Sequence, residues 1–407
     1  MKHTPLPLAA RVVLGGLMLS APLLQAQKFE GLAMTPPMGW NSWNTFETNI
    51  SEELVEDVAR VMIESGMLEA GYNYIVLDDG WMAMERGEDG NLIPHPEKFP
   101  NGMKALADHL HDLGFKFGLY NCAGSLTCGG YPGSQGHEFQ DARLYASIGV
   151  DYLKYDWCSH GTRDAIEAYT TMSRALKAAG RPVVFSVCEW GQNEPWKWAG
   201  DIAHLWRTTG DIIDCWDCNE RWSNGVKKIL DMQMSLQDDH NGLGIYAGPD
   251  HWNDPDMMEV GNPGLTVAES RAHFSLWCVL AAPLIAGNDV RNMSEEIRQI
   301  LTNKEAIAVD QDPLGKQGFR FFQSPEKEIW IRELSGGDWA VCVLNASNER
   351  LATTVDWSHV GLVTGTQDYT IRDLWLHQEL GSTHDEPELS RILEPHDVIL
   401  VRLSPAK

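Results

Sequence analysis

Hydrophobic runs of strand length alternate with amphipathic helical segments over most of this chain. Strands are predicted at residues 72–77, 115–120, 150–156 and 183–187, and helices lie between them at residues 139–147 and 164–179. Shorter strands are predicted at 38–43, near Leu205, at 243–247 and at 283–286, with further helices after Ser51 and at 267–280. Because eight strands that alternate with helices close into a parallel barrel, the predicted fold is α/β, a (β/α)₈ TIM barrel.

The composition changes on either side of this repeat. After about residue 317, short strands joined by turn-rich loops predict a C-terminal antiparallel β-sandwich domain at residues 317–407, following a catalytic barrel at residues 27–316. At the other end, Lys2 and Arg11 precede an apolar run that ends near Ala26. This pattern predicts a signal peptide at residues 1–26 and a secreted or periplasmic protein, because the run is too short to span a membrane.

The chain is strongly acidic, with a formal net charge of −25. Nucleic acids and anionic membrane surfaces are bound by basic patches, so this charge argues against both partners and fits a neutral ligand. Eight cysteines permit disulfides in an exported protein. The spacing of Cys215 and Cys218 is that of a redox pair, but nothing nearby resembles a thioredoxin turn, so a loop disulfide or two free thiols are the predicted alternatives.

Acidic and aromatic residues are placed where the predicted strands end. They are Trp43, Asp78, Asp79, Tyr120, Asp156, Glu189, Asp211, Asp254 and Asp256. Catalytic groups of a (β/α)₈ barrel gather at the carboxyl ends of its strands, which is where these residues would meet. An open doubly wound sheet would also carry acids there, but it would normally have a glycine-rich phosphate loop after its first strand, and this chain has none.

The residue types favour glycoside chemistry. Two carboxyl groups flank the bond that a glycosidase breaks, and one of them must be ionised while the other is protonated. Lys154 and Asp156 lie two positions apart on a strand and so share a face, which would favour an ionised Asp156 as the nucleophile. The proton donor needs a less charged or more desolvated environment. As an alternative, a Ca²⁺ or Mg²⁺ site could be formed by Asp78, Asp79, Asp254 and Asp256.

Seven motifs, in order along the chain, carry a family resemblance. They are Met38-Gly-Trp-Asn-Ser-Trp43, Leu77-Asp-Asp-Gly-Trp81, Leu153-Lys-Tyr-Asp-Trp-Cys158, Cys188-Glu-Trp-Gly191, Trp206-Arg-Thr-Thr-Gly-Asp-Ile212, Trp252-Asn-Asp-Pro-Asp-Met257 and Gln311-Asp-Pro-Leu-Gly-Lys-Gln-Gly318. This set resembles the α-galactosidases (melibiases) of glycoside hydrolase family 27, with plant-like spelling in several motifs. The resemblance extends from about Leu32 to the C-terminus.

The resemblance implies a retaining enzyme with Asp156 as nucleophile and Asp211 as acid/base, without a metal or cofactor. It implies a disulfide between Cys128 and Cys158 at the rim of the pocket. The implied substrate-binding residues are Trp43, Asp78, Asp79, Tyr120, Lys154, Cys188, Glu189, Trp190, Arg207, Asp256 and Met257. Within this set, Asp78 and Asp79 would bind the 6- and 4-hydroxyls of the sugar, Lys154 the region of the 3- and 4-hydroxyls, and Arg207 a position near the 2-hydroxyl.

Substrate choice is expected to depend on Cys188, Glu189 and Trp190. Family members that accept a 2-acetamido group have smaller residues in this segment, so the expected sugar is galactose. Three alternatives stay open: a β-L-arabinopyranosidase or an α-N-acetylgalactosaminidase of the same family, and a galactose-binding protein without turnover. Cys122, Cys215 and Cys218 match no family feature. The expected partner is an α-galactoside, and assembly into a homo-oligomer stays open.

Overall fold

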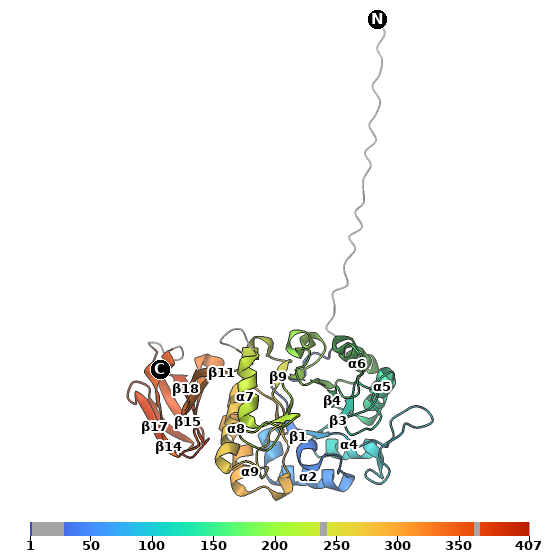
Figure 1. Ribbon diagram of the computed structural model, residues 1–407, viewed down its shortest axis with the longest axis horizontal. Coiled ribbons are helices and arrows are strands. Elements are labelled where there is room, and N and C mark those ends of the chain that lie inside the picture. Colours follow the sequence, from blue (N-terminus) through green and yellow to red (C-terminus); the bar gives the residue numbers. More distant parts are fainter. Residues whose placement is uncertain (2–27, 237–241, 362–366, 407) are drawn as a thin grey trace.

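The computed structural model describes residues 1, 28–236, 242–361 and 367–406, and the predicted signal peptide lies almost entirely outside them. Eight parallel strands form the larger sheet, in the order β10-β1-β2-β3-β4-β5-β6-β9. They are β1 (Met38–Asn41), β2 (Tyr74–Leu77), β3 (Lys116–Cys122), β4 (Tyr152–Asp156), β5 (Val184–Cys188), β6 (Leu205–Arg207), β9 (Trp252–Asp254) and β10 (Leu284–Ala286). The predicted (β/α)₈ barrel is confirmed, and its helices surround the sheet (Figure 1).

The barrel closes just beyond its last ladder. Met258, four residues after β9, makes an isolated parallel bridge with Ala286 of β10. Its backbone N–H donates to the carbonyl of Ile285 at 2.8 Å, and its carbonyl accepts from Gly287 at 3.0 Å. The strands of the barrel are almost wholly buried, as expected of parallel strands covered on both faces.

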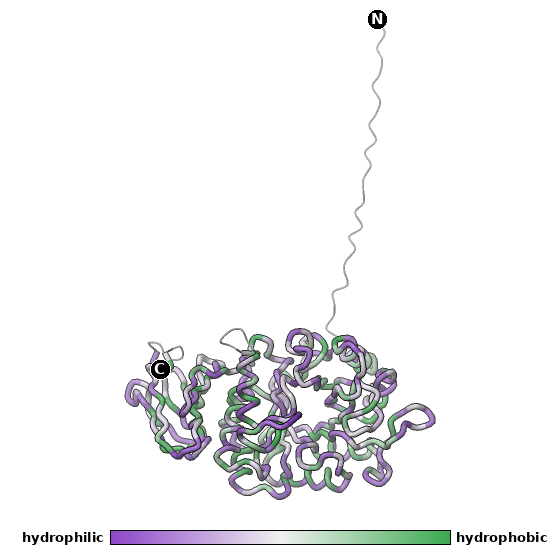
Figure 2. Tube along the Cα trace, viewed as in Figure 1, coloured by the Kyte–Doolittle hydropathy of each residue, from purple (hydrophilic) through white to green (hydrophobic). Residues whose placement is uncertain are grey.

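Ten α-helices of the described chain accompany the strands. They are α1 (Trp43–Phe46), α2 (Glu52–Glu64), α3 (Met67–Ala70), α4 (Gly102–Asp112), α5 (Glu138–Ile148), α6 (Ala165–Ala179), α7 (Val226–Ser235), α8 (Val267–Leu280), α9 (Glu295–Leu301) and α10 (Lys304–Asp310). The predicted cap of α2 is present, because the Ser51 hydroxyl accepts from the N–H of Leu54 at 3.2 Å. Green and purple alternate over short distances along these helices in Figure 2, as expected of helices that bury one face.

Two predicted strands of the barrel differ in the structure. Residues 243–246 of the predicted strand at 243–247 belong to the 3₁₀ helix η3 (Gly242–Tyr246), and the seventh barrel strand is β9 instead. A strand of three residues is too short to show a period in the sequence, whereas the Leu-Gly-Ile-Tyr run looked like one. The opening strand stops at Asn41, and Trp43 begins helix α1.

The C-terminal domain is antiparallel, as predicted, with a six-stranded and a two-stranded sheet. Its strands are β11 (Phe319–Gln323), β12 (Lys327–Glu333), β13 (Trp339–Asn345), β14 (Leu351–Asp356), β15 (Tyr369–Asp373), β16 (Gln378–Ser382), β17 (Glu388–Leu393) and β18 (Val398–Pro405). The sequence predicts five of these strands, at residues 329–332, 339–344, 351–355, 370–374 and 398–403, but not β11, β16 or β17. The two-residue strands β7 (Asp211–Ile212) and β8 (Ser223–Asn224) pair with each other in parallel.

The two domains share one hydrophobic core. Trp330 of β12 and Leu400 of β18 belong to the same buried cluster as the barrel helices. At this interface Arg332 is 1% exposed, and its guanidinium donates to the carbonyls of Cys278 at 2.6 Å and Asp310 at 3.2 Å. In the described residues no helix is long and apolar enough to cross a membrane.

Candidate active site

A cavity of about 470 Å³ opens at the carboxyl ends of the barrel strands. The predicted site residues that line it are Trp43, Asp78, Tyr120, Cys128, Lys154, Asp156, Trp190, Arg207, Asp211, Asp256 and Met257. Three predicted binding residues, Asp79, Cys188 and Glu189, are outside this lining. Cavities of this size commonly bind small molecules, and several charged side chains line this one.

Lys154 forms an ion pair with Asp78 rather than with Asp156. Its ammonium nitrogen is 2.7 Å from the Oδ2 of Asp78, which also accepts from the amide of Asn41 at 2.9 Å. Burial disfavours the Lys154 ammonium, but the surrounding carboxylates, Asp78 first, raise its pKa well above the usual value. The prediction that Lys154 and Asp156 share a strand face did not identify this partner, which directly follows β2, two strands away from β4 in the sheet.

Asp156 is the last residue of β4 and is 6% exposed. The Tyr120 hydroxyl donates to its Oδ2 at 2.9 Å, and the N–H of Trp157 donates to its Oδ1 at 2.8 Å, so the carboxyl group is held in one orientation. Burial raises the pKa of Asp156 to about 7, while Lys154 lowers it and Asp211 raises it. Lys154 thus lowers the pKa of this carboxyl group as expected, but burial has the larger effect, so the net shift is upward.

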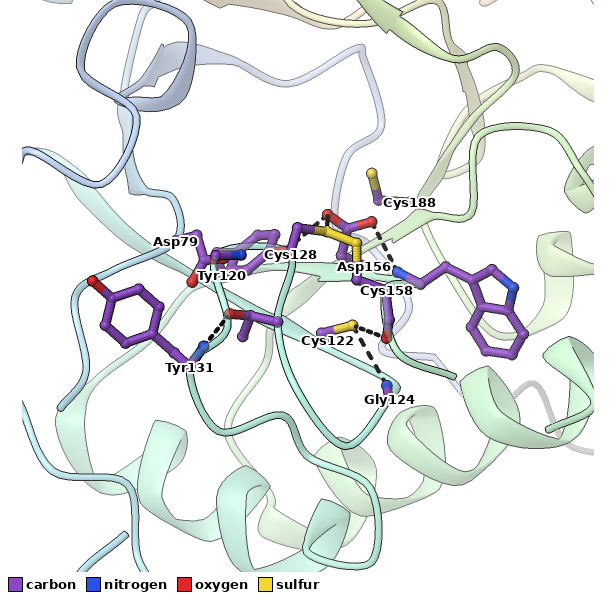
Figure 3. The surroundings of a disulfide bond; sticks show 12 residues. Asp79, Tyr120, Cys122, Gly124, Cys128, Tyr131, Asp156, Cys158 and Cys188 are labelled. Carbon is purple, nitrogen blue, oxygen red and sulfur yellow. Dashed lines mark hydrogen bonds between the residues drawn. A yellow bond between two sulfur atoms is a disulfide. The ribbon is translucent and has the colours of Figure 1, made fainter. Parts of the chain in front are cut away.

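A disulfide joins Cys128 and Cys158 beside this carboxyl group (Figure 3). The Sγ of Cys128 is 3.3 Å from the Oδ2 of Asp156. A side chain at Gly124 would come within 2.0 Å of the Cys158 carbonyl, so the two loops can approach this closely only with glycine there. The bond fixes the loop that follows the predicted nucleophile.

Asp79 stabilises the other loop of this disulfide, the one that carries Cys128. It is fully buried, and its Oδ2 accepts from the N–H of Gly129 at 2.7 Å, next to Cys128. Burial raises the pKa of Asp79, whereas hydrogen bonds from the loop lower it. The free thiol of Cys122 is also buried here, 3.0 Å from the carbonyl of Cys158. Direct contact of Asp79 with a sugar stays a prediction.

Arg207, at the end of β6, connects Asp211 and Asp256. It is 3% exposed, and its Nη2 is 3.0 Å from the Oδ1 of Asp211 and 2.7 Å from the Oδ2 of Asp256. The side chain of Asp211 is 45% exposed, so the predicted proton donor is more hydrated than the predicted nucleophile. This reverses the expectation that the donor would be in the more desolvated place.

Asp256 has a strained backbone conformation that hydrogen bonds stabilise. Its φ of 92° is in the left-handed region, which costs a non-glycine residue about 1–3 kcal/mol. Its Oδ2 accepts from the N–H of Ile212 at 2.9 Å, and its carbonyl accepts from the indole of Trp277 at 2.9 Å. Burial raises the pKa of Asp256 and Arg207 lowers it. These bonds fix Asp256 beside Arg207 at the edge of the cavity.

The segment from Cys188 to Trp190 is only partly within reach of a ligand. Trp190 lines the cavity, but Glu189 is fully buried and accepts from the N–H and amide of Asn193 at 2.7 and 2.6 Å. Burial raises the pKa of Glu189 to about 7. Cys188 faces a smaller adjoining cavity, with its Sγ 3.7 Å from a guanidinium nitrogen of Arg207. Binding of a sugar by Cys188 and Glu189 is thus still a prediction.

The predicted alternative of a cation site is not favoured by the charges present. Two of the four proposed ligands already pair with a positive side chain, Asp78 with Lys154 and Asp256 with Arg207. Within the described residues, the one set of three potential ligands is Cys128, Asp156 and Cys158. Its two sulfurs are joined in a disulfide and offer no thiolate.

The sequence prediction missed several residues of the cavity wall. They are Asn44, Thr45, Glu47, Ile212, Ile213, Asp214, Ser223, Glu259, Asn262 and Pro263. Asn44 directly follows one of the recognised motifs, and Glu259 lies two residues after another. Their closeness to these motifs is the feature of the sequence that could have identified them. The other pair from the sequence, Cys215 and Cys218, forms a loop disulfide, which is one of the two predicted alternatives.

Comparison with known proteins shows the family. Residues 35–312 match the model for alpha galactosidase A, and residues 324–403 match the alpha galactosidase C-terminal beta sandwich domain. The chain is 50% identical over 394 residues to alpha-galactosidase A of Cellvibrio japonicus, covering 93% of this chain and 94% of that one. It is 43% identical over 376 residues to an alpha-galactosidase of Oryza sativa, covering 92% and 86%.

Solved structures agree. Alpha-galactosidase I from Mortierella vinacea has a TM-score of 0.86 at 34% identity, covering 92% of this chain and 98% of that one. An alpha-galactosidase from Saccharomyces cerevisiae, solved with raffinose, has a TM-score of 0.86 at 30% identity, covering 94% and 99%. The family models together span most of the chain, with the barrel and the β-sandwich in the same order. The chain therefore belongs to the α-galactosidases of glycoside hydrolase family 27.

Proposed function

We propose that this enzyme removes terminal α-D-galactosyl residues from galactosides by a retaining double displacement. The observation that carries the proposal is the position of Asp156. Its carboxyl group is at the floor of the cavity, oriented by Tyr120 and Trp157, and it shares that cavity with the more hydrated Asp211. Two carboxyl groups in one cavity are what this chemistry requires.

In the first step Asp211 donates a proton to the glycosidic oxygen while Asp156 attacks the anomeric carbon. The bond to the leaving group breaks, and a galactosyl ester of Asp156 forms with inverted configuration. In the second step Asp211 removes a proton from water, which attacks the same carbon and releases Asp156 as a carboxylate. Two inversions give galactose with its original α configuration. Because Asp156 is desolvated, its ionised form is poorly stabilised and therefore a stronger nucleophile.

We assign recognition of the sugar to the charged side chains that line the cavity. The Asp78–Lys154 pair offers both an acceptor and a donor to adjacent hydroxyls, and Arg207 offers donors on the side of Asp211. Trp43 and Tyr120 supply aromatic walls, and Asp256 with Met257 closes one side. Asp78 would accept from a 6-hydroxyl, which favours galactose over L-arabinopyranose. Trp190 lines the cavity, and a side chain of its size would leave room for a 2-hydroxyl rather than for a 2-acetamido group.

Location and assembly extend the proposal. The N-terminal pattern supports export into a secreted or periplasmic compartment, where the two disulfides would be stable. A homo-oligomer is compatible with the acidic surface but is not required by the site.

The test is release of p-nitrophenol from p-nitrophenyl α-D-galactopyranoside by the mature protein and by its Asp156→Ala variant. We expect turnover by the wild type and a loss of at least a thousandfold in the variant, with the first galactose formed seen by NMR as the α anomer. Absence of turnover with galactose still bound would indicate a binding protein instead. An initial β anomer would refute the retaining mechanism, and faster release from the α-N-acetylgalactosaminide or β-L-arabinopyranoside would favour those alternatives.

A further inference from the structure

One wall of the cavity is not used by the proposed mechanism. It is formed by Asn44 of α1 and by Glu259 and Asn262, which follow β9. Glu259 is 2% exposed and connects the two segments. Its Oε1 accepts from the amide of Asn44 at 2.5 Å, and its Oε2 accepts from the amide of Asn262. The carboxyl group of Glu259 thus fixes the position of both asparagine side chains.

Helix α8 supports this wall from behind. The Nε2 of His273 accepts from the N–H of Glu259 at 3.0 Å, and the His273 ring packs edge-on against Trp277 with centroids 4.0 Å apart. On the other segment, the Thr45 hydroxyl donates to the carbonyl of Gly287 at 2.7 Å. The wall is therefore pre-organised, which reduces the ordering cost of binding a ligand.

The wall is polar but close to neutral. Burial raises the pKa of Glu259 to about 8, and the charges of Asp214 and Asp256 raise it as well, so the carboxyl group carries a proton at neutral pH. A protonated carboxyl group donates one hydrogen bond, and the asparagine oxygens accept others. An uncharged ligand with several hydroxyls suits such a surface, whereas a phosphate or a carboxylate would meet Asp214 and Asp256.

We propose that Asn44, Glu259 and Asn262 form the binding site for the leaving-group sugar, the hydroxylated unit to which the galactosyl residue is attached. The inference rests on the proposed function, because it takes Asp156 and the Lys154–Asp78 pair to hold the galactosyl unit. Asp211, the proton donor to the bond between the two sugars, lines the same cavity. A cavity of about 470 Å³ leaves room for a second ring beside the first.

The kinetic test compares two leaving groups. For wild type, Glu259→Gln and Asn44→Ala, kcat/KM is measured for melibiose, which releases glucose, and for p-nitrophenyl α-galactoside, which releases an aromatic group. Even when it is protonated, Glu259 has a lone pair on each oxygen for an asparagine amide, whereas the amide nitrogen of a glutamine cannot accept, so one asparagine loses its partner. We expect the ratio of the melibiose value to the aryl value to fall about tenfold in each variant. Glu269→Gln is the matched control, because its carboxylate bonds Thr266 and His396 and does not line the cavity.

A binding test separates this inference from the proposed function. In an Asp156→Asn background, calorimetry compares the affinities for galactose and melibiose with and without Glu259→Gln. We expect the glucosyl unit to strengthen binding only while Glu259 is present. An unchanged ratio and an unchanged melibiose affinity in folded variants, checked by their thermal midpoints, would overturn the inference. Lack of turnover by the wild type would overturn the proposed function alone, because the calorimetric result does not depend on it.

Discussion

Replacing Asp156 by asparagine should stabilise this protein at neutral pH. In the folded chain the Asp156 carboxyl group is 6% exposed, and burial raises its pKa to about 7 from an ordinary value of 3.8. At neutral pH the unfolded chain keeps the carboxylate hydrated, whereas the folded chain must bury it or protonate it. An asparagine of nearly the same shape removes that cost.

The magnitude follows from the difference in pKa. Each unit corresponds to about 1.4 kcal/mol, so the upper limit at pH 7 and above is about 4 kcal/mol. The bonds from Tyr120 and Trp157 are made to a charged acceptor, and with a neutral amide each would lose about 1 kcal/mol. The expected net gain is about 1–3 kcal/mol, a rise of a few degrees in the thermal midpoint.

The sign of the pH dependence distinguishes this explanation from a general packing effect. Because the folded pKa is raised, the wild type has its full stability below about pH 4 and loses stability as the pH rises toward 7. The variant lacks this group, so its advantage should be small at pH 4 and largest above pH 7.

Differential scanning calorimetry of both proteins from pH 4 to 8 measures this advantage. Asp211→Asn is the matched control, because its side chain is already 45% exposed and its replacement relieves little burial. A variant that is no more stable than the wild type at pH 8, or one whose advantage grows toward pH 4, would refute the reasoning.

Two further predictions concern the cross-links of the fold. Replacing both Cys128 and Cys158 by serine should lower the thermal midpoint. The disulfide closes a 30-residue loop, and by reducing the entropy of the unfolded chain it stabilises the fold by about 3–4 kcal/mol. An unchanged midpoint would show that other contacts hold the loop. Replacing Arg332 by methionine should destabilise the protein by about 3–5 kcal/mol, because two buried carbonyls lose their hydrogen-bond donor and the Asp310 carboxyl group loses its cation. Adding Asp310→Asn to that variant should recover part of the lost stability. Calorimetric midpoints of the single and double variants measure this, and equal midpoints for Arg332→Met and wild type would contradict it.

The long elements of the barrel could be predicted because their residues are buried in a regular pattern. The helix at residues 267–280 begins and ends where the sequence predicted, since it has a capping box at Thr266 and a mostly apolar C-terminal half. The strand of three residues at β9 has no period that a sequence can show. In the β-sandwich, β16 and β17 carry few buried residues and so resemble loops in sequence.

For the candidate site residues, the position in the fold was easier to predict than the ion-pair or hydrogen-bond partner. The sequence placed Asp156 at a strand end beside the cavity, because the carboxyl ends of barrel strands meet there. It could not show that Lys154 would bond Asp78, because the two residues come from strands that β3 separates, and their contact depends on how the sheet curls into a barrel. It also could not show that burial outweighs Lys154 in setting the pKa of Asp156, because burial is a property of the packed chain.

The structure also connects the β-sandwich to the wall of the cavity through helix α8. Helix α8 contacts the cavity wall with one face and the β-sandwich with the other. On one face His273 and Trp277 bond the backbone of Glu259 and Asp256, which line the cavity. On the opposite face, Arg271 is 2.9 Å from Asp397 of the β-sandwich, and the carbonyl of Cys278 accepts from Arg332. Because Asp256 is held in a strained conformation by these contacts, loss of the β-sandwich would expose the buried face of α8 and loosen the residue that positions Arg207 beside Asp211.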